Sequence, residues 1–242
     1  MAKNFRLYIK EELICDKIIP LEESQAHYLK NVVKYNVGET IHCFDNKNGE
    51  FCCKISSLDK KNPTLAVLNK MRDYHKCPDI WLLFAPLKKD KTDFVIEKAT
   101  ELGCSRIIPV ITQNTITKNI KIERYEAQSI EAAEQCRRTD LPQIANPIDL
   151  VKLIPNWDHD RPLFYMDETL KSKDFFTVLS QVKHKKAAIL IGPEGGFSQE
   201  ELTILHDTVF AHGATLGPRI LRAETAATAA LSCWQLICGD WS

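Results

Sequence analysis

Two short loops near the C-terminus hold the residue types that bind a ligand and act on its charge. Residues 192–196 read GPEGG and offer backbone amides with one carboxylate, whereas residues 217–222 read GPRILR and offer amides with two arginines. Glycine lets a ligand approach the main chain closely, and a positioned arginine stabilises negative charge as it develops. We therefore expect a site in which the backbone binds a ligand and Glu194, Arg219 and Arg222 act on it.

Each loop follows a short apolar run that predicts a strand buried in a sheet, at residues 187–191 and 214–216. Ser198 stands three residues before Glu201, a capping box that predicts a helix, and we expect this helix to end near Gly213. In open α/β sheets, ligands bind outside the carboxyl ends of the strands. Two ordinary turns are the alternative, but four glycines, two prolines and two arginines in such short loops favour a site.

Strands and helices alternate ahead of these loops. The expected strands cover residues 80–85, 106–111 and 163–166, and the expected helices cover 91–102, 122–138 and 174–183. In the first of these helices we expect Phe94 to point inward. A last helix presents one apolar face made of Ala223, Ala226, Ala227, Ala230, Leu231, Trp234 and Cys238. This alternation predicts an α/β domain with a mostly parallel sheet wrapped by helices.

The N-terminal part follows a different pattern. Short runs at residues 4–9, 40–44, 51–55 and 64–68 predict strands, residues 22–33 predict a helix, and Asn48-Gly49 predicts a hairpin. Short strands joined by turns favour a small β-barrel. The polar stretch 73–79 is typical of a linker, so we predict a β-barrel domain over residues 1–72 and an α/β domain over residues 80–242.

Composition bounds the function only loosely. The 242 residues carry a formal net charge of zero, which does not favour nucleic-acid binding, although Arg137-Arg138 forms a dense basic spot or a solvated face. No apolar run approaches the length of a membrane span. Nine scattered cysteines without zinc spacing indicate buried thiols in a reducing cytosol. We therefore expect a cytoplasmic protein that uses neither a membrane nor a metal.

Two familiar phosphate-binding loops fit the first loop poorly. A Walker A loop needs GxxxxGK[ST], and no Lys-Ser or Lys-Thr follows GPEGG. A Rossmann fingerprint needs GxGxxG after a first strand, with an acid about 20 residues further on. GPEGG lacks that spacing and lies near the end of its domain.

Four stretches of the chain together resemble one enzyme family. IGPEGGFS and LGPRILRAETAATAAL, with KATELGCSRIIPVIT and EAAEQCRR upstream, are similar to the signature of the RsmE family. Members of that family are 16S ribosomal RNA uridine-N3 methyltransferases in the SPOUT, or trefoil-knot, superfamily. The likeness covers the whole C-terminal domain, and the N-terminal part matches in length and style with weaker motifs.

The resemblance implies a fold, a cofactor and partners. It implies a C-terminal SPOUT-type α/β knot with a PUA-like barrel before it, a homodimer, S-adenosylmethionine as methyl donor and 16S rRNA of the small ribosomal subunit as acceptor. Donor contacts are expected mainly from the backbone of the two loops and from the end of an earlier strand, at Met166, Ile191, Gly192, Glu194, Gly195, Gly196, Leu216, Gly217, Ile220, Leu221 and Arg222. RNA contacts are expected at Arg6, Gln135 and Arg138.

Methylation of uracil N3 needs stabilisation of the anion left when the N3 proton departs. Arg219 and Arg222 are expected to stabilise it, with Arg138 from the EAAEQCRR helix as a third candidate and Glu194 as a base or as a partner for the donor's amino end. For each arginine the alternative is a structural ion pair. Another knotted methyltransferase acting on tRNA, or on a different base or ribose, and a non-catalytic ribosome-assembly factor that binds RNA remain open.

Overall fold

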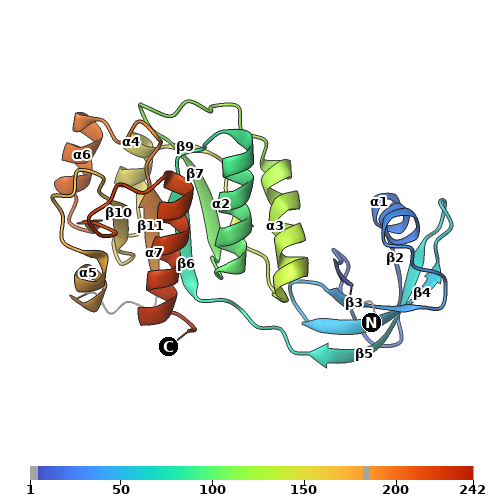
Figure 1. Cartoon of the computed structure of the whole chain (residues 1–242). Helices are drawn as coiled ribbons and strands as arrows, with labels where there is room; N and C mark the ends of the chain where they lie inside the picture. Colours follow the sequence, from blue (N-terminus) through green and yellow to red (C-terminus); the bar gives the residue numbers. More distant parts are fainter. Residues whose placement is uncertain (1–4, 182–185, 242) are drawn as a thin grey trace. The chain divides into compact units, whose positions relative to one another are not determined.

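The computed structural model of the chain describes residues 5–181 and 186–241. By its internal contacts the chain divides into two units, drawn in Figure 1. The first comprises residues 1–76 and 133–141, and the second comprises residues 77–132 and 142–242. The first unit thus takes in a segment that is distant from the rest of it in sequence.

The first unit is built on a five-stranded sheet in the order β1-β3-β4-β5-β2. Its elements are β1 (Arg6–Tyr8), β2 (Ile18–Pro20), α1 (Glu23–His27), a π-helical turn (Tyr28–Val32), β3 (Thr40–Phe44), β4 (Glu50–Ser57) and β5 (Thr64–Arg72). β3 and β4 pair antiparallel, which confirms the predicted hairpin. Gly49 enters β4 with a φ of +107°, and a Cβ there would lie 2.2 Å from the carbonyl oxygen of Arg72, so only glycine fits. β2 escaped prediction because its three residues are too few to show alternation.

A buried arginine fastens residues 133–141 to this sheet. The Arg6 guanidinium donates hydrogen bonds to the carbonyl oxygens of Ala133 at 2.7 Å and Arg138 at 2.6 Å, and it pairs with Glu50 at 3.1 Å. Arg6 is only 6% exposed. The Arg6 guanidinium is therefore engaged within its own unit, and its expected contact with RNA stays a prediction.

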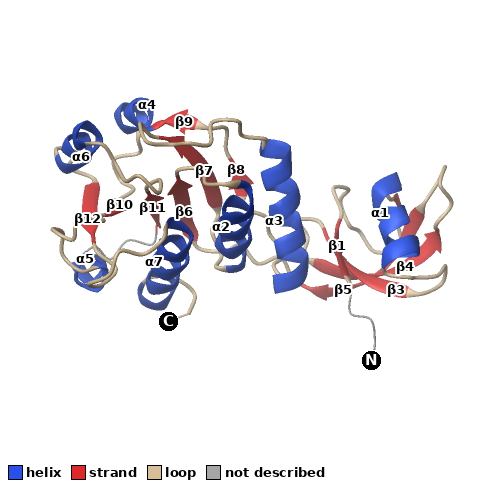
Figure 2. Ribbon diagram, turned by 45° about the horizontal axis from the view of Figure 1, so that its top comes forward, coloured by secondary structure: helices blue, strands red, loops and turns tan. Residues whose placement is uncertain are grey.

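The second unit holds a sheet in the order β12-β10-β11-β6-β7-β8, with β9 pairing beside β7 (Figure 2). Every pair in it is parallel, which confirms the predicted parallel sheet. The strands are β6 (Asp79–Phe84), β7 (Arg106–Ile111), β8 (Gln143–Ile144), β9 (Ile148–Asp149), β10 (Leu163–Met166), β11 (Lys186–Ile191) and β12 (Ala211–Ala214). The helices are α2 (Lys89–Glu101), α3 (Ile122–Cys136), α4 (Leu150–Leu153), a 3-10 turn (Ile154–Asn156), α5 (Phe175–Gln181), α6 (Gln199–His206) and α7 (Ala223–Ile237).

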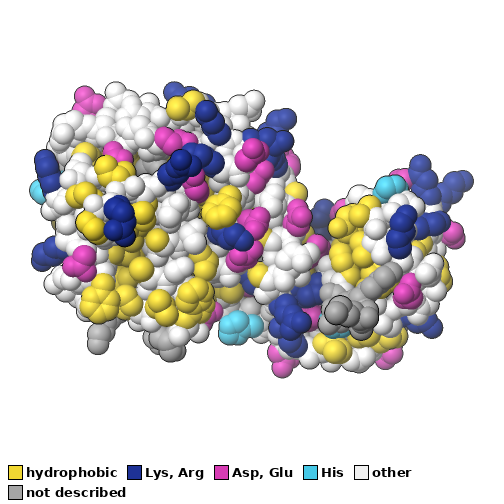
Figure 3. Space-filling view, viewed as in Figure 1, with side chains coloured by type: hydrophobic (Ala, Val, Ile, Leu, Met, Phe, Trp, Pro, Cys, Tyr) yellow, Lys and Arg dark blue, Asp and Glu magenta, His cyan; other side chains and the backbone are white. Residues whose placement is uncertain are grey.

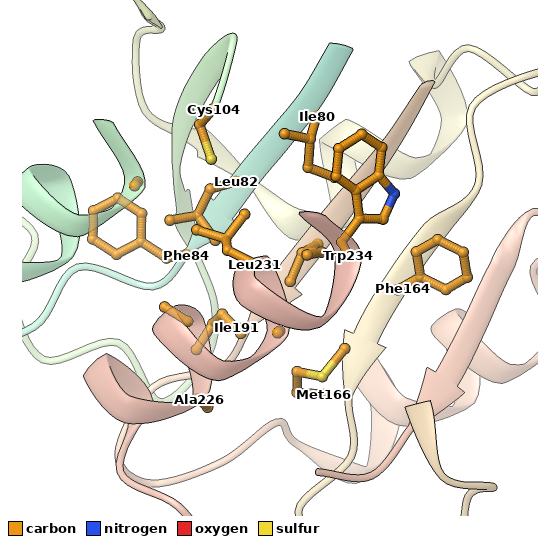
Figure 4. Packing of buried hydrophobic residues seen from close by; sticks show 14 of the residues in the cluster. Ile80, Leu82, Phe84, Cys104, Phe164, Met166, Ile191, Ala226, Leu231 and Trp234 are labelled. Atoms are coloured by element: carbon orange, nitrogen blue, oxygen red, sulfur yellow. The ribbon is translucent and has the colours of Figure 1, made fainter. Parts of the chain in front are cut away.

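Side chains alternate between the two faces of the sheet along each strand, so one strand contributes residues to the cores on both faces. Ile80, Leu82 and Phe84 of β6 join the core under α2, α5 and α7, whereas Leu83 joins a second core under α4 and α6. Trp234 of α7 is completely buried in the first of these cores (Figure 4). The central strands are therefore mostly apolar after a charged first residue (Asp79 in β6, Arg106 in β7, Lys186 in β11), as expected for a parallel sheet buried on both sides.

Several boundaries differ from the sequence-based expectations. Helix α6 ends at His206 rather than near Gly213, and strand β12 covers Ala211–Ala214 instead of residues 214–216. The sequence AHGA has no β-branched residue, so pairing with β10, rather than propensity, makes it a strand. Phe94 was expected to point inward but is 40% exposed. No helix in the described residues is long and apolar enough to cross a bilayer.

Candidate functional site

A cavity of about 480 Å³ opens at the carboxyl ends of β10, β11 and β12. Both sequence-predicted loops line it, together with α2 and the first turns of α7. Predicted site residues in its wall are Met166, Ile191, Gly192, Glu194, Leu216, Arg219, Ile220, Leu221 and Arg222. The two loops, separated by a helix and a strand in sequence, therefore form one site at the edge of the sheet where ligands of α/β proteins bind.

Three predicted glycines shape the loops without lining the cavity wall. Asn114 donates hydrogen bonds from its side-chain amide to the carbonyl oxygens of Gly195 at 3.1 Å and Gly196 at 3.0 Å. Gly196 and Gly217 have φ values of +70° and +94°, in the region that favours glycine. These positions fix the path of the loops, whereas their neighbours provide the surface that a ligand would touch.

The first loop is held to its helix by the predicted capping box. Ser198 Oγ accepts a hydrogen bond from the Glu201 amide at 3.2 Å, and the Glu201 carboxylate accepts one from the Ser198 amide at 2.8 Å. Glu201 also accepts a hydrogen bond from the amide of Gln113 at 2.8 Å. The sequence predicted the box but gave no sign that Gln113 and Asn114, in the loop after β7, brace the loop after β11.

A third loop, residues 167–172, closes another side of the cavity. The carboxylate of Asp167 accepts hydrogen bonds from the amides and hydroxyls of Thr169 and Ser172, at 2.7 to 3.2 Å. Burial raises the pKa of Asp167, but these hydrogen bonds outweigh that effect and hold the pKa below its usual value. Asp167 is therefore an ionised anchor that sets the shape of the loop.

Glu168, which sequence reasoning missed, lies in the cavity wall beside the first loop. A Cβ built on Gly196 would fall 1.6 Å from Glu168 Oε1, so the carboxylate rests directly against the glycine backbone. Burial, followed by the neighbouring charge of Asp167, raises the pKa of Glu168. Its signal in the sequence was weak because a single acid after a strand is common.

Lys91, at the start of α2, bridges two carboxylates of the site. Its Nζ lies 3.4 Å from Glu194 Oε1 in the first loop and 3.7 Å from Glu224 Oε1 in the first turn of α7. All three side chains are partly buried. Lys91 therefore ties the first loop to α7, and Glu194 already has a cationic partner.

Arg219 and Arg222 are exposed on the second loop and line the cavity. Within residues 5–181 and 186–241, no ion pair or side-chain hydrogen bond engages either guanidinium. Among the described residues, neither arginine therefore forms the structural ion pair that was the alternative. Two unengaged cations beside a cavity are suited to binding or stabilising an anion.

Arg138 and Gln135, expected to act with this site, belong to the first unit. Arg138 is 8% exposed, and its guanidinium donates two hydrogen bonds of 3.0 Å to the carboxylate of Asp140. A buried bidentate ion pair thus engages two nitrogens of Arg138, and its role in catalysis or RNA binding stays a prediction. Gln135 is exposed and, with Arg72 and Arg137, lines a second cavity of about 680 Å³ within the first unit.

Known proteins resemble the chain over nearly its whole length. The family model described as an RNA methyltransferase domain matches residues 75–235, and one described as an RNA methyltransferase PUA domain matches residues 21–68. Ribosomal RNA small subunit methyltransferase E of Rickettsia conorii is 31% identical, with 95% of this chain and 94% of that protein covered. The protein of the same name from Bacillus subtilis is 30% identical, with 96% and 95% covered.

Two solved structures share the fold of this chain over nearly its whole length. The Neisseria gonorrhoeae ribosomal RNA small subunit methyltransferase E bound to S-adenosyl methionine has a TM-score of 0.88 at 27% identity, with 99% of this chain and 100% of that one covered. A Legionella pneumophila protein, solved in complex with the bound cofactor SAM, has a TM-score of 0.89 at 28% identity and the same coverage.

Proposed function

This chain belongs to the family of ribosomal RNA small subunit methyltransferase E, and on that premise we propose that it methylates N3 of a uridine in the 16S rRNA of the small subunit. It is an S-adenosylmethionine-dependent rRNA methyltransferase. Its second unit has the α/β fold of the SPOUT, or trefoil-knot, methyltransferases, and its first unit is PUA-like. The methylated atom of the uridine, the roles of the catalytic residues and the homodimer are proposals.

The observation that carries the proposal is the cavity shared by the two loops. Its volume lies within the range of about 300–1,000 Å³ that is usual for small-molecule sites. Apolar side chains such as Met166, Ile191 and Leu221 line it beside charged ones, which suits a donor that joins a flat adenine to a charged amino-acid chain. The residues present therefore fit S-adenosylmethionine.

The charged residues of the cavity suit methylation of uracil N3. The bound donor supplies an activated methyl group, so the protein needs no covalent step of its own. Loss of the N3 proton leaves an anion spread over the flanking carbonyl oxygens, and Arg219 and Arg222 are proposed to stabilise it. Glu194 is proposed to receive the proton or to hold the amino end of the donor, with Lys91 fixing its position.

The first unit is proposed to bind the RNA. The cavity of about 680 Å³ in this unit is lined by Gln135, Arg137 and Arg72. Arg72 donates hydrogen bonds to the Glu50 carboxylate and, at 3.0 Å, to the carbonyl oxygen of Arg137. Basic and acidic side chains are interspersed on the face drawn in Figure 3, so RNA binding would depend on local contacts rather than on one large basic field.

A homodimer and a cytoplasmic location complete the proposal. Leu236 of α7 is 58% exposed and Trp241 beyond it is 51% exposed, which provides apolar surface for a second copy. The nine cysteines are thiols rather than disulfides, as suits a reducing compartment. Sedimentation equilibrium tests the dimer, and a mass that stays at that of one chain, 27.6 kDa, at micromolar concentration would count against it.

The test of function is a methyl-transfer assay with labelled S-adenosylmethionine. The acceptors are naked small-subunit rRNA, assembled small subunits and bulk tRNA from a strain that lacks the gene, and mass spectrometry identifies the methylated nucleoside. N3-methyluridine in the rRNA or subunit sample is the expected result. Methylated tRNA would show that tRNA rather than rRNA is the substrate. Donor binding without methyl transfer to any RNA would favour a non-catalytic ribosome-assembly factor.

A further inference from the structure

The cavity proposed for the methyl donor contains three carboxylates that differ in what already engages them. Asp167 accepts four hydrogen bonds from its own loop. Glu194 is paired with Lys91 at 3.4 Å. For Glu168, no ion pair or hydrogen bond occurs among the residues that the structure describes. Glu168 is therefore the carboxylate of the cavity with its charge left to interact with a ligand.

Glu168 is an exposed residue of the cavity wall, and its carboxylate lies against the backbone of the first loop. Glu168 follows Met166 and Asp167 at the end of β10, and all three residues line the cavity. Its Oε1 and Cδ lie 1.6 and 2.6 Å from where a Cβ of Gly196 would be, so the space it occupies exists only because residue 196 is glycine. The first loop thus makes room for a carboxylate that has no partner of its own.

We propose that Glu168 determines specificity for the charged methyl donor over the uncharged-sulfur product. S-Adenosylmethionine carries a permanent positive charge on its sulfur, and S-adenosylhomocysteine differs from it only by the methyl group and that charge. A carboxylate facing the ligand therefore attracts the donor more strongly than the product, which favours exchange of product for donor after each turnover. This inference rests on the proposed location of the donor in this cavity.

The electrostatic environment of Glu168 supports this role. Glu168 is exposed as a residue, but partial burial of its carboxylate and the nearby charge of Asp167 raise its pKa, so both effects disfavour the ionised form. A positive charge placed beside it would compensate both effects. A neutral hydroxyl pair of the ribose would compensate them less and would be the same in donor and product.

The experiment is calorimetric binding of S-adenosylmethionine and S-adenosylhomocysteine to the full chain and to two variants. Glu168→Gln keeps the size of the side chain and removes its charge. Asp167→Asn, the matched control, changes the adjacent carboxylate, whose hydrogen bonds shape the loop. We expect Glu168→Gln to lower donor affinity about tenfold, as loss of one charge-assisted contact would, and product affinity less than about twofold. Asp167→Asn is expected to weaken both ligands alike.

The ratio of the two affinities decides the outcome. Equal weakening of donor and product by Glu168→Gln would overturn the proposal in favour of a ribose contact or a structural role, and no change in either would also overturn it. A third variant, Ala223→Phe, adds bulk at a half-buried position of the cavity wall and tests the site itself. Unchanged donor affinity in that variant would show that the donor binds outside this cavity. Lost affinity there, with an unaltered ratio in Glu168→Gln, would refute only the role of Glu168.

Discussion

Substituting alanine for Gly196 separates two effects that the structure assigns to this position. An alanine at a φ of +70° costs roughly 1–2 kcal/mol from its backbone conformation. The new Cβ would also meet Glu168 Oε1 at 1.6 Å, so the glutamate must leave its present position. Because no described partner holds its carboxylate, the move costs only about 0.5–1.5 kcal/mol, the range for an unfavourable rotamer.

Gly217→Ala is the matched control. Gly217 has a φ of +94° and nothing within 4 Å of an added Cβ, so it carries the backbone cost without the clash. We expect Gly196→Ala to destabilise the second unit by about 0.5–1.5 kcal/mol more than Gly217→Ala does. Each kcal/mol corresponds to roughly 2–4 °C in Tm for a domain of this size. Placing both changes in a Glu168→Ala background should remove the difference.

Tryptophan fluorescence during urea or thermal unfolding is the appropriate assay. The four tryptophans, Trp81, Trp157, Trp234 and Trp241, all lie in the second unit, so the signal reports on that unit alone. Gly196→Ala should in addition weaken donor binding, whereas Gly217→Ala should weaken it less. Equal destabilisation by the two substitutions, or a difference that persists without Glu168, would refute the contact between Glu168 and the loop.

Three further predictions concern charged side chains. Arg219→Ala should leave donor affinity within about twofold but lower the single-turnover rate by about 100-fold, as loss of one transition-state donor does, and an unchanged rate removes Arg219 from the chemistry. Arg137→Gly should preserve stability, since Arg137 has a φ of +64°, yet lower RNA affinity and reduce the salt slope by about 1; an unaltered slope denies that contact. Burial raises the pKa of Glu50, but Arg72 and Arg6 outweigh it and leave the folded-state pKa below the ordinary 4.5. The stability that Glu50 contributes to the first unit is thus fully present above pH 4.5 and is lost as pH falls through the folded-state pKa, which hydrogen exchange of that unit measures. Glu50→Gln should lower stability at neutral pH by about 3–5 kcal/mol and abolish this acid-dependent loss, and a persisting loss contradicts the assignment.

Local sequence patterns predicted the features that depend on neighbouring residues. Short apolar runs predicted the positions of β6, β7, β10 and β11, and the capping pair Ser198 and Glu201 predicted the start of α6. The two loops were also found, because glycine and proline act locally on the backbone. Features that depend on distant residues were not predicted. Asn114 braces the first loop from the loop after another strand, and Lys91 of α2 pairs with Glu194 across the site.

The arginines show the same limit. Arg6, Arg138, Arg219 and Arg222 were all candidates in the sequence, which shows neither burial nor pairing. Burial and pairing distinguish them, because Arg6 and Arg138 have buried partners whereas the second-loop pair has none among the described residues. The linker expected at residues 73–79 stays a prediction. Residues 73–78, which lie between β5 and β6, form no regular secondary structure.

The return of residues 133–141 to the first unit has a consequence for synthesis on the ribosome. The first unit begins at the N-terminus, but the backbone groups that accept hydrogen bonds from Arg6 are contributed by Ala133 and Arg138. Its β-strands are complete by Arg72, yet the Arg6 side chain must wait for a long stretch of later chain to emerge. A nascent chain paused before residue 133 would therefore hold a sheet in which Arg6 has its ion pair with Glu50 but lacks its hydrogen bonds to Ala133 and Arg138. Completion of the two units is coupled in time, and chaperone engagement or proteolysis of stalled chains should change sharply once residue 141 leaves the exit tunnel.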